Sequence, residues 1–431
     1  MLKIGDRKLI NSWAFYDWAN SVYSLVISTA VFPLYYSAVT DGKTVSFLWT
    51  EWNHPDSLYS YALSFSFLIV AFISPILSGI ADYTGNKKKF MKFFCWLGGL
   101  SVCSLYFFEG IDTVWIGIVF TILASIGFWS SLVFYNAYLP EVAHPEQQDR
   151  ASAKGFIYGY IGSVILLIIS LIMIQKPDLF GITTALASRF SFVLVGLWWI
   201  GFAQITFRRL PNNIYNKKPG KDFIWRGYKE LKNVANEIIN YPVLKRFLIS
   251  FFLLSVGVQT IILLATIFGS KELGLETIDL IITVLLIQIV AILGAFLFSR
   301  LSEKKGNIFA LKLTIIIWML VCFCAFLLHK GLPNVSIYFY CLGGVLGLVL
   351  GAIQSLTRST YSKLLPETED HATYFSFYDV TEKIAIVLGT FVYGFLYAIT
   401  DSMQWSVLCL AVFFLASFII LTTLKKTKYV R

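Results

Sequence analysis

The sequence predicts an all-α polytopic membrane protein with twelve transmembrane helices in two pseudo-symmetric halves of six. Three observations predict this fold class: the composition, the length and number of the apolar segments, and a motif that occurs once in each half. Of the 431 residues, 57% are hydrophobic and only 14% are charged, and the mean hydropathy is +0.71. Soluble domains carry about 25% charged residues, so this composition excludes a soluble fold.

Twelve apolar segments are each long enough to cross a bilayer as a helix, which takes about 20 residues. The alternation of apolar and polar residues that marks barrel strands is absent from these segments, so we predict helices. The segments of the first half are Trp13–Val39, Leu58–Ala81, Phe90–Phe108, Val114–Leu139, Gly155–Ile174 and Ser188–Phe207. Those of the second half are Phe247–Phe268, Ile278–Phe298, Ile308–Leu328, Ser336–Leu356, Tyr374–Ile399 and Trp405–Leu424.

Basic residues gather on one side of the predicted membrane. Nearly all of the 35 lysines and arginines lie before the first segment, after the last, or in and beside the even-numbered loops. Because basic residues mark cytoplasmic loops, we predict that both termini are cytoplasmic and that the protein lies in the inner (cell) membrane. The net charge of +10 is then a topology signal, and we expect no nucleic-acid partner. The basic residues predicted on the other, external side of the membrane are Lys43, Lys176, Arg189, Lys271 and Lys330.

The chain is predicted to consist of two six-helix halves, residues 1–207 and 247–431, joined by a cytoplasmic linker, residues 208–246. Within the linker, Asp222–Asn240 has the pattern of an amphipathic helix, and basic residues such as Lys229 favour contact with an anionic inner leaflet. A surface-lying spacer is favoured over a regulatory module, because some link between the halves is needed. The predicted apolar face consists of Ile224, Tyr228, Leu231, Ala235 and Ile238.

The first predicted helix carries polar residues at helical spacing, which form one stripe: Asp17, Asn20, Ser24 and Ser28. A carboxylate facing lipid costs roughly 2.5–3.5 kcal/mol, so we expect the stripe to face water or protein. Two interpretations remain open. The stripe is either a helix–helix contact sealed by hydrogen bonds or a functional site, in which Asp17 is the best candidate for carrying a proton.

A motif of the form Ser-x-aliphatic-small-acid-x-x-Gly-Asn occurs at Ser78–Asn86 and again at Ser299–Asn307. The two copies follow the second helix of each half on the same side of the membrane, which indicates two halves in parallel orientation. The acids are predicted to cap or pair with a neighbouring helix, and the glycines to permit a left-handed turn. The predicted gating residues are the acids and glycines of the two copies together with two nearby basic residues, Lys87 and Arg150: Asp82, Gly85, Lys87, Arg150, Glu303 and Gly306.

The first copy resembles the helix 2–3 signature of the major facilitator superfamily, Gly-x-Leu-Ala-Asp-Arg-x-Gly-Arg-Lys. Asp82, Gly85 and Lys87 match it, whereas Ser78 replaces its first glycine and Tyr83 and Asn86 replace two basic residues. Arg150 and Lys154 lie in the loop after the fourth helix, beside this turn. They are either solvated surface charges or partners in a gate ion pair.

A narrower resemblance covers nearly the whole chain. Several blocks are similar to blocks of the "unknown major facilitator" family, which includes the fungal autophagy-related vacuolar amino-acid effluxer. The resemblance implies transport of amino acids or another small polar solute. Several members have an acid just before the glycine of the helix 7 block, where this chain has Val256. The blocks are Phe15–Ser21, Phe134–Glu141, Gly257–Thr260, Gln354–Ser359 and Phe377–Val380.

Helices 10 and 11 carry further signals. Helix 10 has small residues every four positions, which favour either close packing or a flexible helix: Gly343, Gly347, Gly351 and Ser355. Helix 11 places Asp379, Glu382 and Lys383 on one face, where Asp379 and Lys383 can neutralise each other. Glu382 is then protonated or paired elsewhere. The other candidates for binding substrate or a proton are Tyr16, Asn136, Gln259, Gln354 and Arg358.

These features predict a secondary transporter of a small polar solute that works by alternating access, with a proton as the favoured coupling ion. The sequence has no Gly-x-x-x-x-Gly-Lys-Ser/Thr loop, so ATP drive is unsupported. The alternatives are a non-transporting sensor or scaffold and, less favoured, an intramembrane enzyme. The enzyme has little support, because the four histidines are scattered and the sequence has no Gly-x-Ser-x-Gly motif. We expect no cofactor and no metal, a monomer, and no partners beyond the substrate, a proton and the lipid bilayer.

Overall fold

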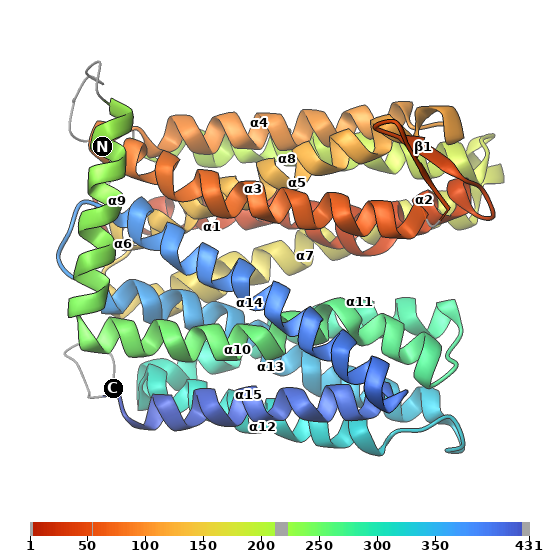
Figure 1. Cartoon of the computed structure of the whole chain (residues 1–431). Helices are drawn as coiled ribbons and strands as arrows, with labels where there is room; N and C mark the ends of the chain where they lie inside the picture. Colours follow the sequence, from red (N-terminus) through yellow and green to blue (C-terminus); the bar gives the residue numbers. More distant parts are fainter. Residues whose placement is uncertain (1–2, 54, 212–222, 425–431) are drawn as a thin grey trace. The chain divides into compact units, whose positions relative to one another are not determined.

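The computed structural model describes residues 3–53, 55–211 and 223–424, which are helical over most of their length (Figure 1). Among these residues, twelve helices are long and apolar enough to cross a membrane, which confirms the predicted fold class. The chain folds into two compact units. Unit 1 comprises Met1–Tyr138, Tyr158–Leu231 and Asp370–Ser376, and unit 2 comprises Leu139–Ile157, Lys232–Glu369 and Phe377–Arg431.

In the first half of the chain, the described residues form eight α-helices, shorter 3₁₀ and π segments, and one hairpin. In order they are α1 (Arg7–Val22), η1 (Tyr23–Val31), α2 (Phe32–Thr40), β1 (Val45–Phe47), β2 (Thr50–Trp52), α3 (Pro55–Thr84), α4 (Lys87–Ser104), η2 (Leu105–Phe107), η3 (Ile111–Thr113), α5 (Val114–Ala137), α6 (Leu139–Val142), η4 (Pro145–Gln147), α7 (Gln148–Gln175), η5 (Pro177–Phe180) and α8 (Thr184–Arg209).

The linker helix and the second half complete the described chain. They are α9 (Phe223–Asn240), α10 (Pro242–Ile267), η6 (Phe268–Glu272), α11 (Thr277–Lys305), α12 (Asn307–Leu327), α13 (Val335–Leu364), α14 (His371–Thr400) and α15 (Met403–Thr422). The compact units differ from the sequence halves in two segments. Leu139–Ile157, which contains α6, η4 and the start of α7, belongs to unit 2, and Asp370–Ser376 at the start of α14 belongs to unit 1. The linker helix α9 is divided between the units after Leu231.

The first span is not a continuous α-helix, because η1 is a π-helix. In a π-helix the backbone hydrogen bonds run from residue i to residue i+5. The Thr29 hydroxyl also donates to the Ser24 carbonyl oxygen, at 2.9 Å. Of the residues of the predicted polar stripe, Asp17 and Asn20 are buried, Ser24 is exposed and Ser28 is half-buried. Pro33, which has no N–H to continue the α-helical pattern, lies just after the π segment.

Glycines allow α11 and α13 of unit 2 to approach closely. A Cβ atom added to Gly347 would lie 2.5 Å from the Ile287 carbonyl oxygen, and one added to Gly351 would collide with the Ala291 carbonyl oxygen. Gly343 would likewise meet the Thr283 side chain at 2.7 Å. The sequence allowed either close packing or a flexible helix at these glycines of α13, and the structure shows close packing.

The predicted apolar face of the linker helix α9 is only partly buried against protein. Ile238 is buried, whereas Tyr228 is exposed. Gly227 and Val234, which are not part of the predicted face, are also buried. Gly227 is in contact with α3, because a Cβ atom on Gly79 would lie 2.5 Å from the Gly227 carbonyl oxygen. Within the predicted helix, Asp222 and the side chain of Ile224 lie outside what the structure describes.

The loop between the first two spans contains the hairpin of β1 and β2, which pairs Val45 with Trp52 and Phe47 with Thr50. Leu48 and Trp49 at its tip both have positive φ, 51° and 61°. Positive φ at both tip positions is the geometry of a type I′ turn, which usually takes Asn-Gly. The sequence analysis missed the hairpin because Leu-Trp does not indicate such a turn.

We predict that leucine at position 351 destabilises the fold, because its side chain has no room against the Ala291 carbonyl group. Overpacking costs about 1–3 kcal/mol, so Gly351→Leu should lower the Tm of the purified protein by several degrees or prevent folding. Gly344→Leu is the matched control on the same helix, since a Cβ atom there has no neighbour within 4 Å. Equal losses of Tm in the two variants would contradict the close-packing role.

Candidate functional site

Asp17 lies inside unit 1, in an aromatic setting. The Tyr135 hydroxyl on α5 donates to Asp17 Oδ2 at 2.8 Å, and Trp13 Nε1 donates to the Tyr135 carbonyl oxygen at 2.8 Å. The rings of Trp13 and Tyr16 pack on that of Tyr135, with centroid distances of 4.6 and 5.1 Å. Asp17 is buried. The carboxylate therefore faces protein, and an aromatic cluster fixes its position.

Asn20 follows Asp17 on the next turn of α1 and is also buried. Its Nδ2 donates no hydrogen bond to any residue that the structure describes. A buried donor without a partner costs about 1–3 kcal/mol. Helix α1 thus presents a buried carboxylate and an unpartnered amide donor one turn apart. Asn136, next to Tyr135 on α5, is half-buried.

Helices α10 and α14 of unit 2 hold four of the predicted residues together. Lys383 Nζ lies 2.7 Å from Asp379 Oδ1 and 3.6 Å from Glu382 Oε2. Gln259 Nε2 donates to Glu382 Oε1 at 2.6 Å. The sequence left open whether Glu382 is paired, and the structure gives it both Gln259 and Lys383 as partners. The acids of this region lie on α14, whereas Val256 of α10 is a fully buried apolar residue.

The α14 group contains two carboxylates, Asp379 and Glu382, and one ammonium, Lys383. Asp379 Oδ2 is buried and accepts no hydrogen bond among the described residues. If both acids are ionised, the three groups carry one net negative charge inside a spanning helix. Such a charge is costly there, so the group favours binding of one proton, which would make its net charge zero.

Asp82 caps the first turn of α14 within unit 1. Its carboxylate accepts from the backbone N–H groups of Ala372 at 3.1 Å and Thr373 at 2.7 Å, and from the Thr373 hydroxyl at 2.8 Å. Lys87 Nζ lies 3.4 Å from Asp82 Oδ1. A helix N-terminus favours an anion through its N–H groups and its dipole. Gly85 has φ of +67°, the left-handed turn that the motif predicted.

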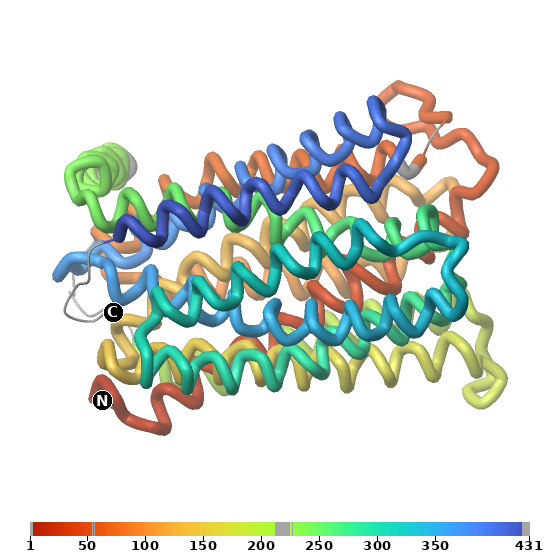
Figure 2. Tube along the Cα trace, turned by 90° about the horizontal axis from the view of Figure 1, so that it is seen from below, coloured from red at the N-terminus to blue at the C-terminus, as the bar shows by residue number. Residues whose placement is uncertain are grey.

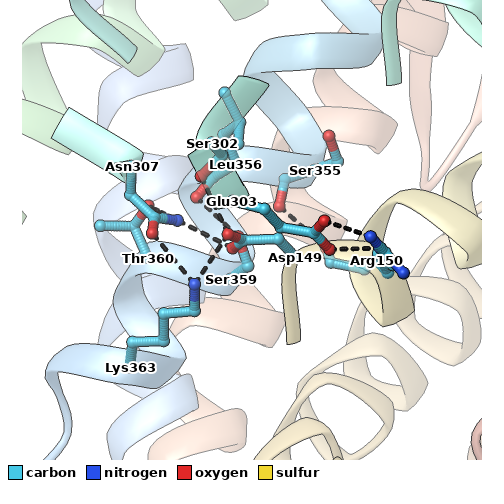
Figure 3. Close-up of polar contacts among 11 residues, drawn as sticks. Asp149, Arg150, Ser302, Glu303, Asn307, Ser355, Leu356, Ser359, Thr360 and Lys363 are labelled. Carbon is cyan, nitrogen blue, oxygen red and sulfur yellow. Dashed lines mark hydrogen bonds and ion pairs between the residues drawn. The ribbon is translucent and has the colours of Figure 1, made fainter. Parts of the chain in front are cut away.

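The second copy of the motif, in unit 2, uses a different acid (Figure 3). Asp149 in the first turn of α7 accepts from the Ser302 hydroxyl at 2.9 Å and from Asn307 Nδ2 at 2.8 Å. Lys363 Nζ on α13 lies 2.7 Å from Asp149 Oδ2. Asp149, Ser302 and Asn307 are buried, and the Lys363 side chain is 6% exposed. The motif's own acid, Glu303, takes no part in it.

Glu303 pairs instead with Arg150, at N–O distances of 2.5 and 2.6 Å (Figure 3). The Arg150 side chain is 71% exposed, and that of Glu303 is 20% exposed. Exposed pairs contribute about 0–1 kcal/mol. Arg150 is therefore in an ion pair while most of its side chain is exposed. Lys154 is half-buried, and Gly306 has φ of +93°.

Arg358 is buried at the docking site of α7 on α13. Its Nε donates to the Ser152 hydroxyl at 2.9 Å and its Nη2 to the Ser152 carbonyl oxygen at 2.8 Å. The guanidinium lies 4.2 Å from the centroid of the Phe156 ring, and Ser152 Oγ donates to the Ser355 carbonyl oxygen at 2.8 Å. Arg358 thus holds the start of α7 in place. Gln354, one turn earlier on α13, is half-buried.

The sequence analysis missed four residues of these sites: Tyr135, Asp149, Ser152 and Lys363. A signal existed for two of them. Tyr135 lies inside a recognised block beside Asn136, and Asp149 stands in the first turn of a helix, where an acid is favoured. The described residues contain no group of three or more histidines, cysteines or acids that could hold a metal ion.

Twelve spans and the repeated turn define a class of membrane transporter, and comparison with known proteins agrees. The chain resembles the fucose transporter FucP in its outward conformation (TM-score 0.70, 14% identity, 97% of this chain and 98% of the other). It also resembles the proton:xylose symporter XylE (TM-score 0.70, 12% identity, 98% and 96%). These likenesses show the fold of the major facilitator superfamily.

The model of the family described as "Vacuole effluxer Atg22 like" matches residues 5–430, so the chain belongs to this family. It is 33% identical over 414 residues to the uncharacterized MFS-type transporter YxiO of Bacillus subtilis, covering 95% of this chain and 93% of that protein. It is 26% identical over 459 residues to autophagy-related protein 22-1 of Penicillium rubens, covering 86% and 75%. The protein is a transporter of this superfamily and not an enzyme.

We predict that the Asp149–Lys363 pair is strongly coupled. Asp149→Asn or Lys363→Met alone leaves a buried charge without its partner, which costs about 3–5 kcal/mol. The double variant removes both charges and should lose less stability than the two single variants together. Thermal unfolding of the four proteins in one detergent measures this cycle.

Arg150→Gln is the control for that cycle, because it breaks an exposed pair and should change stability by no more than about 1 kcal/mol. Additive losses in the Asp149–Lys363 cycle would show that the two charges do not interact.

Proposed function

We propose that this protein is a secondary transporter of a small, amino-acid-like solute, working by alternating access and coupled to protons. The observation that carries the proposal is the pair of groups on α1. Asp17 offers a carboxylate and Asn20 a buried amide donor without a described partner. A zwitterionic amino acid needs an acceptor for its ammonium group and a donor for its carboxylate, and the two residues supply one of each.

The family supports the same solute class. The resemblance found in the sequence includes a vacuolar amino-acid effluxer, and the matching family is described as a vacuole effluxer. Tyr16 and Tyr135 fit this proposal, because aromatic rings stabilise a bound ammonium group by cation–π attraction.

Proton coupling rests on the acids inside the spans. Asp17 is one carrier in this proposal, and the group of Asp379, Glu382 and Lys383 is the other, since one proton would neutralise it. Arg358 is held by Ser152 and is therefore assigned to gating rather than to the solute.

In this proposal the gate consists of the two turns after α3 and α11. Asp82 holds the start of α14, and Asp149 holds the turn that contains Ser302 and Asn307. Both contacts are expected to form when the protein is closed toward the cytoplasm and to break when it opens. Both termini are cytoplasmic in this scheme.

A thermal-shift panel tests the solute class. We expect at least one α-amino acid to raise the Tm of the purified protein in a concentration-dependent way, because a ligand that binds only the folded state stabilises it. The same amino acid as its amide should act more weakly, and Asn20→Leu should remove the preference for a carboxylate. A Tm raised by sugars but by no amino acid would overturn the solute assignment.

Proton coupling is tested with Asp17→Asn, which keeps the size and one carbonyl acceptor but cannot bind a proton. We expect proteoliposomes of this variant to lose accumulation driven by a pH gradient. They should retain some exchange of labelled solute, at lower affinity, because the carbonyl oxygen can still accept from the ammonium group but carries no charge. Asp112→Asn, a change of the same chemistry at an exposed position, should behave as the wild type. Wild-type accumulation by Asp17→Asn would rule out the proposed proton carrier.

A further inference from the structure

Helix α9 exposes large apolar side chains although it is not one of the spanning helices. Trp225 is 74% exposed, Tyr228 54% and Ile239 59%. The rings of Trp225 and Tyr228 touch edge to face, with centroids 6.4 Å apart. A soluble surface rarely leaves such side chains in water next to one another. Something else therefore covers this part of α9.

The exposed side chains lie on one flank of the helix. At 3.6 residues per turn, Trp225, Tyr228 and Ile239 fall within about 60° of one another, and the exposed Lys232 lies among them. Lys229 is exposed beside this flank, whereas Glu230 and Glu237 lie on the opposite flank. We call the residues Trp225, Tyr228, Lys229, Lys232 and Ile239 the basic aromatic flank.

Between the two flanks lies the buried side of α9, and the part of it that belongs to unit 1 contacts α3. Gly227 lies against Gly79 so closely that neither position has room for a Cβ atom. The helix crosses the end of α3 in Figure 1, and Figure 2 shows it almost end-on while the spanning helices of unit 1 extend across the view. A helix in this position runs along a membrane surface instead of crossing it.

We infer that the basic aromatic flank of α9 is a docking surface for anionic phospholipid headgroups. Tryptophan and tyrosine concentrate at the membrane–water interface, where a ring can lie among acyl chains with its polar edge in the headgroups. Lysines on the same flank meet the negative charge of the headgroups. The acidic flank would face water.

The contact of α9 with α3 links this surface to the Asp82 turn. Gly79, which contacts Gly227, precedes Asp82 by three residues on α3, about one helical turn. Asp82 in turn caps the first turn of α14. Anionic lipid that holds α9 down therefore stabilises the segment of unit 1 that carries this cap. The inference is independent of the transported solute.

The test places an environment-sensitive fluorophore on either side of α9 in the full-length protein. Tyr228→Cys and Asn233→Cys are five positions apart, about 140° around the helix, and both positions are exposed. The parent for both variants has serine in place of the accessible cysteines, Cys103, Cys324, Cys341 and Cys409. Each labelled protein is reconstituted in nanodiscs of phosphatidylcholine alone or mixed with phosphatidylglycerol.

We expect the label at position 228 to shift to the blue and to be quenched by headgroup-region nitroxide lipid when phosphatidylglycerol is present. The label at position 233 should stay in water in both lipids. Adding Lys229→Gln and Lys232→Gln should remove most of the phosphatidylglycerol dependence, as should high salt. The Tm of the unlabelled protein should rise with phosphatidylglycerol, and the lysine variant should lose most of that rise.

Three outcomes would overturn the inference. A label at 228 that stays in water in every lipid would point to a protein partner or to no partner. Equal shifts in the two lipids would show apolar insertion without recognition of anionic headgroups. Equal shifts at 228 and 233 would show that no flank is preferred. A monodisperse elution profile of each variant confirms folding, so failure to fold cannot be mistaken for any of these results.

Discussion

An ionisable side chain inside a membrane-spanning helix must be paired or shielded, and the sites of this protein follow from that constraint. Asp17 is held by the Tyr135 hydroxyl within an aromatic cluster, and Asp379 is held by Lys383 on its own helix. Asp149 meets Lys363 and two neutral donors. Lys383 is a local partner, four residues from Asp379 on the same helix. The partners of Asp17 and Asp149 lie on other helices, so helix packing decides whether those two carboxylates are paired.

The two copies of the motif solve the same problem in opposite ways. In unit 1 the acid is on the turn, and the start of the neighbouring helix supplies the donors to Asp82. In unit 2 the acid is on the helix, and the turn supplies the donors to Asp149 through Ser302 and Asn307. Glu303, which occupies the position of Asp82, is left to an exposed pair with Arg150. A repeat in sequence thus keeps the contact between turn and helix while exchanging donor and acceptor.

Sequence reasoning reached those features that depend on local pattern. Apolar length gave the twelve spans, the repeated motif gave the left-handed turn at Gly85, and spacing gave the Asp379–Lys383 pair. It failed where a partner comes from a distant part of the chain, as with Tyr135 for Asp17 and Asp149 for Asn307. It did not foresee the π-helical segment of the first span, because the stripe argument assumes 3.6 residues per turn throughout. The contact of Gly227 with Gly79 of α3 could not be predicted either, because the two glycines lie far apart in the sequence.

Helix α14 gives these separate sites a physical connection. Its first residues belong to unit 1, where Asp82 accepts from Thr373, and the rest belongs to unit 2. Asp379 follows Thr373 by six residues, about 9 Å along one continuous helix at 1.5 Å per residue. Because a hydrogen-bonded helix is stiff over two turns, it cannot leave the Asp82 cap without moving the acids and Lys383. Under the proposed coupling, binding of a proton to the α14 group and opening of the Asp82 contact then occur together, as parts of one movement of the helix. Neutralising the acids would change the free energy of that step, as coupled transport requires.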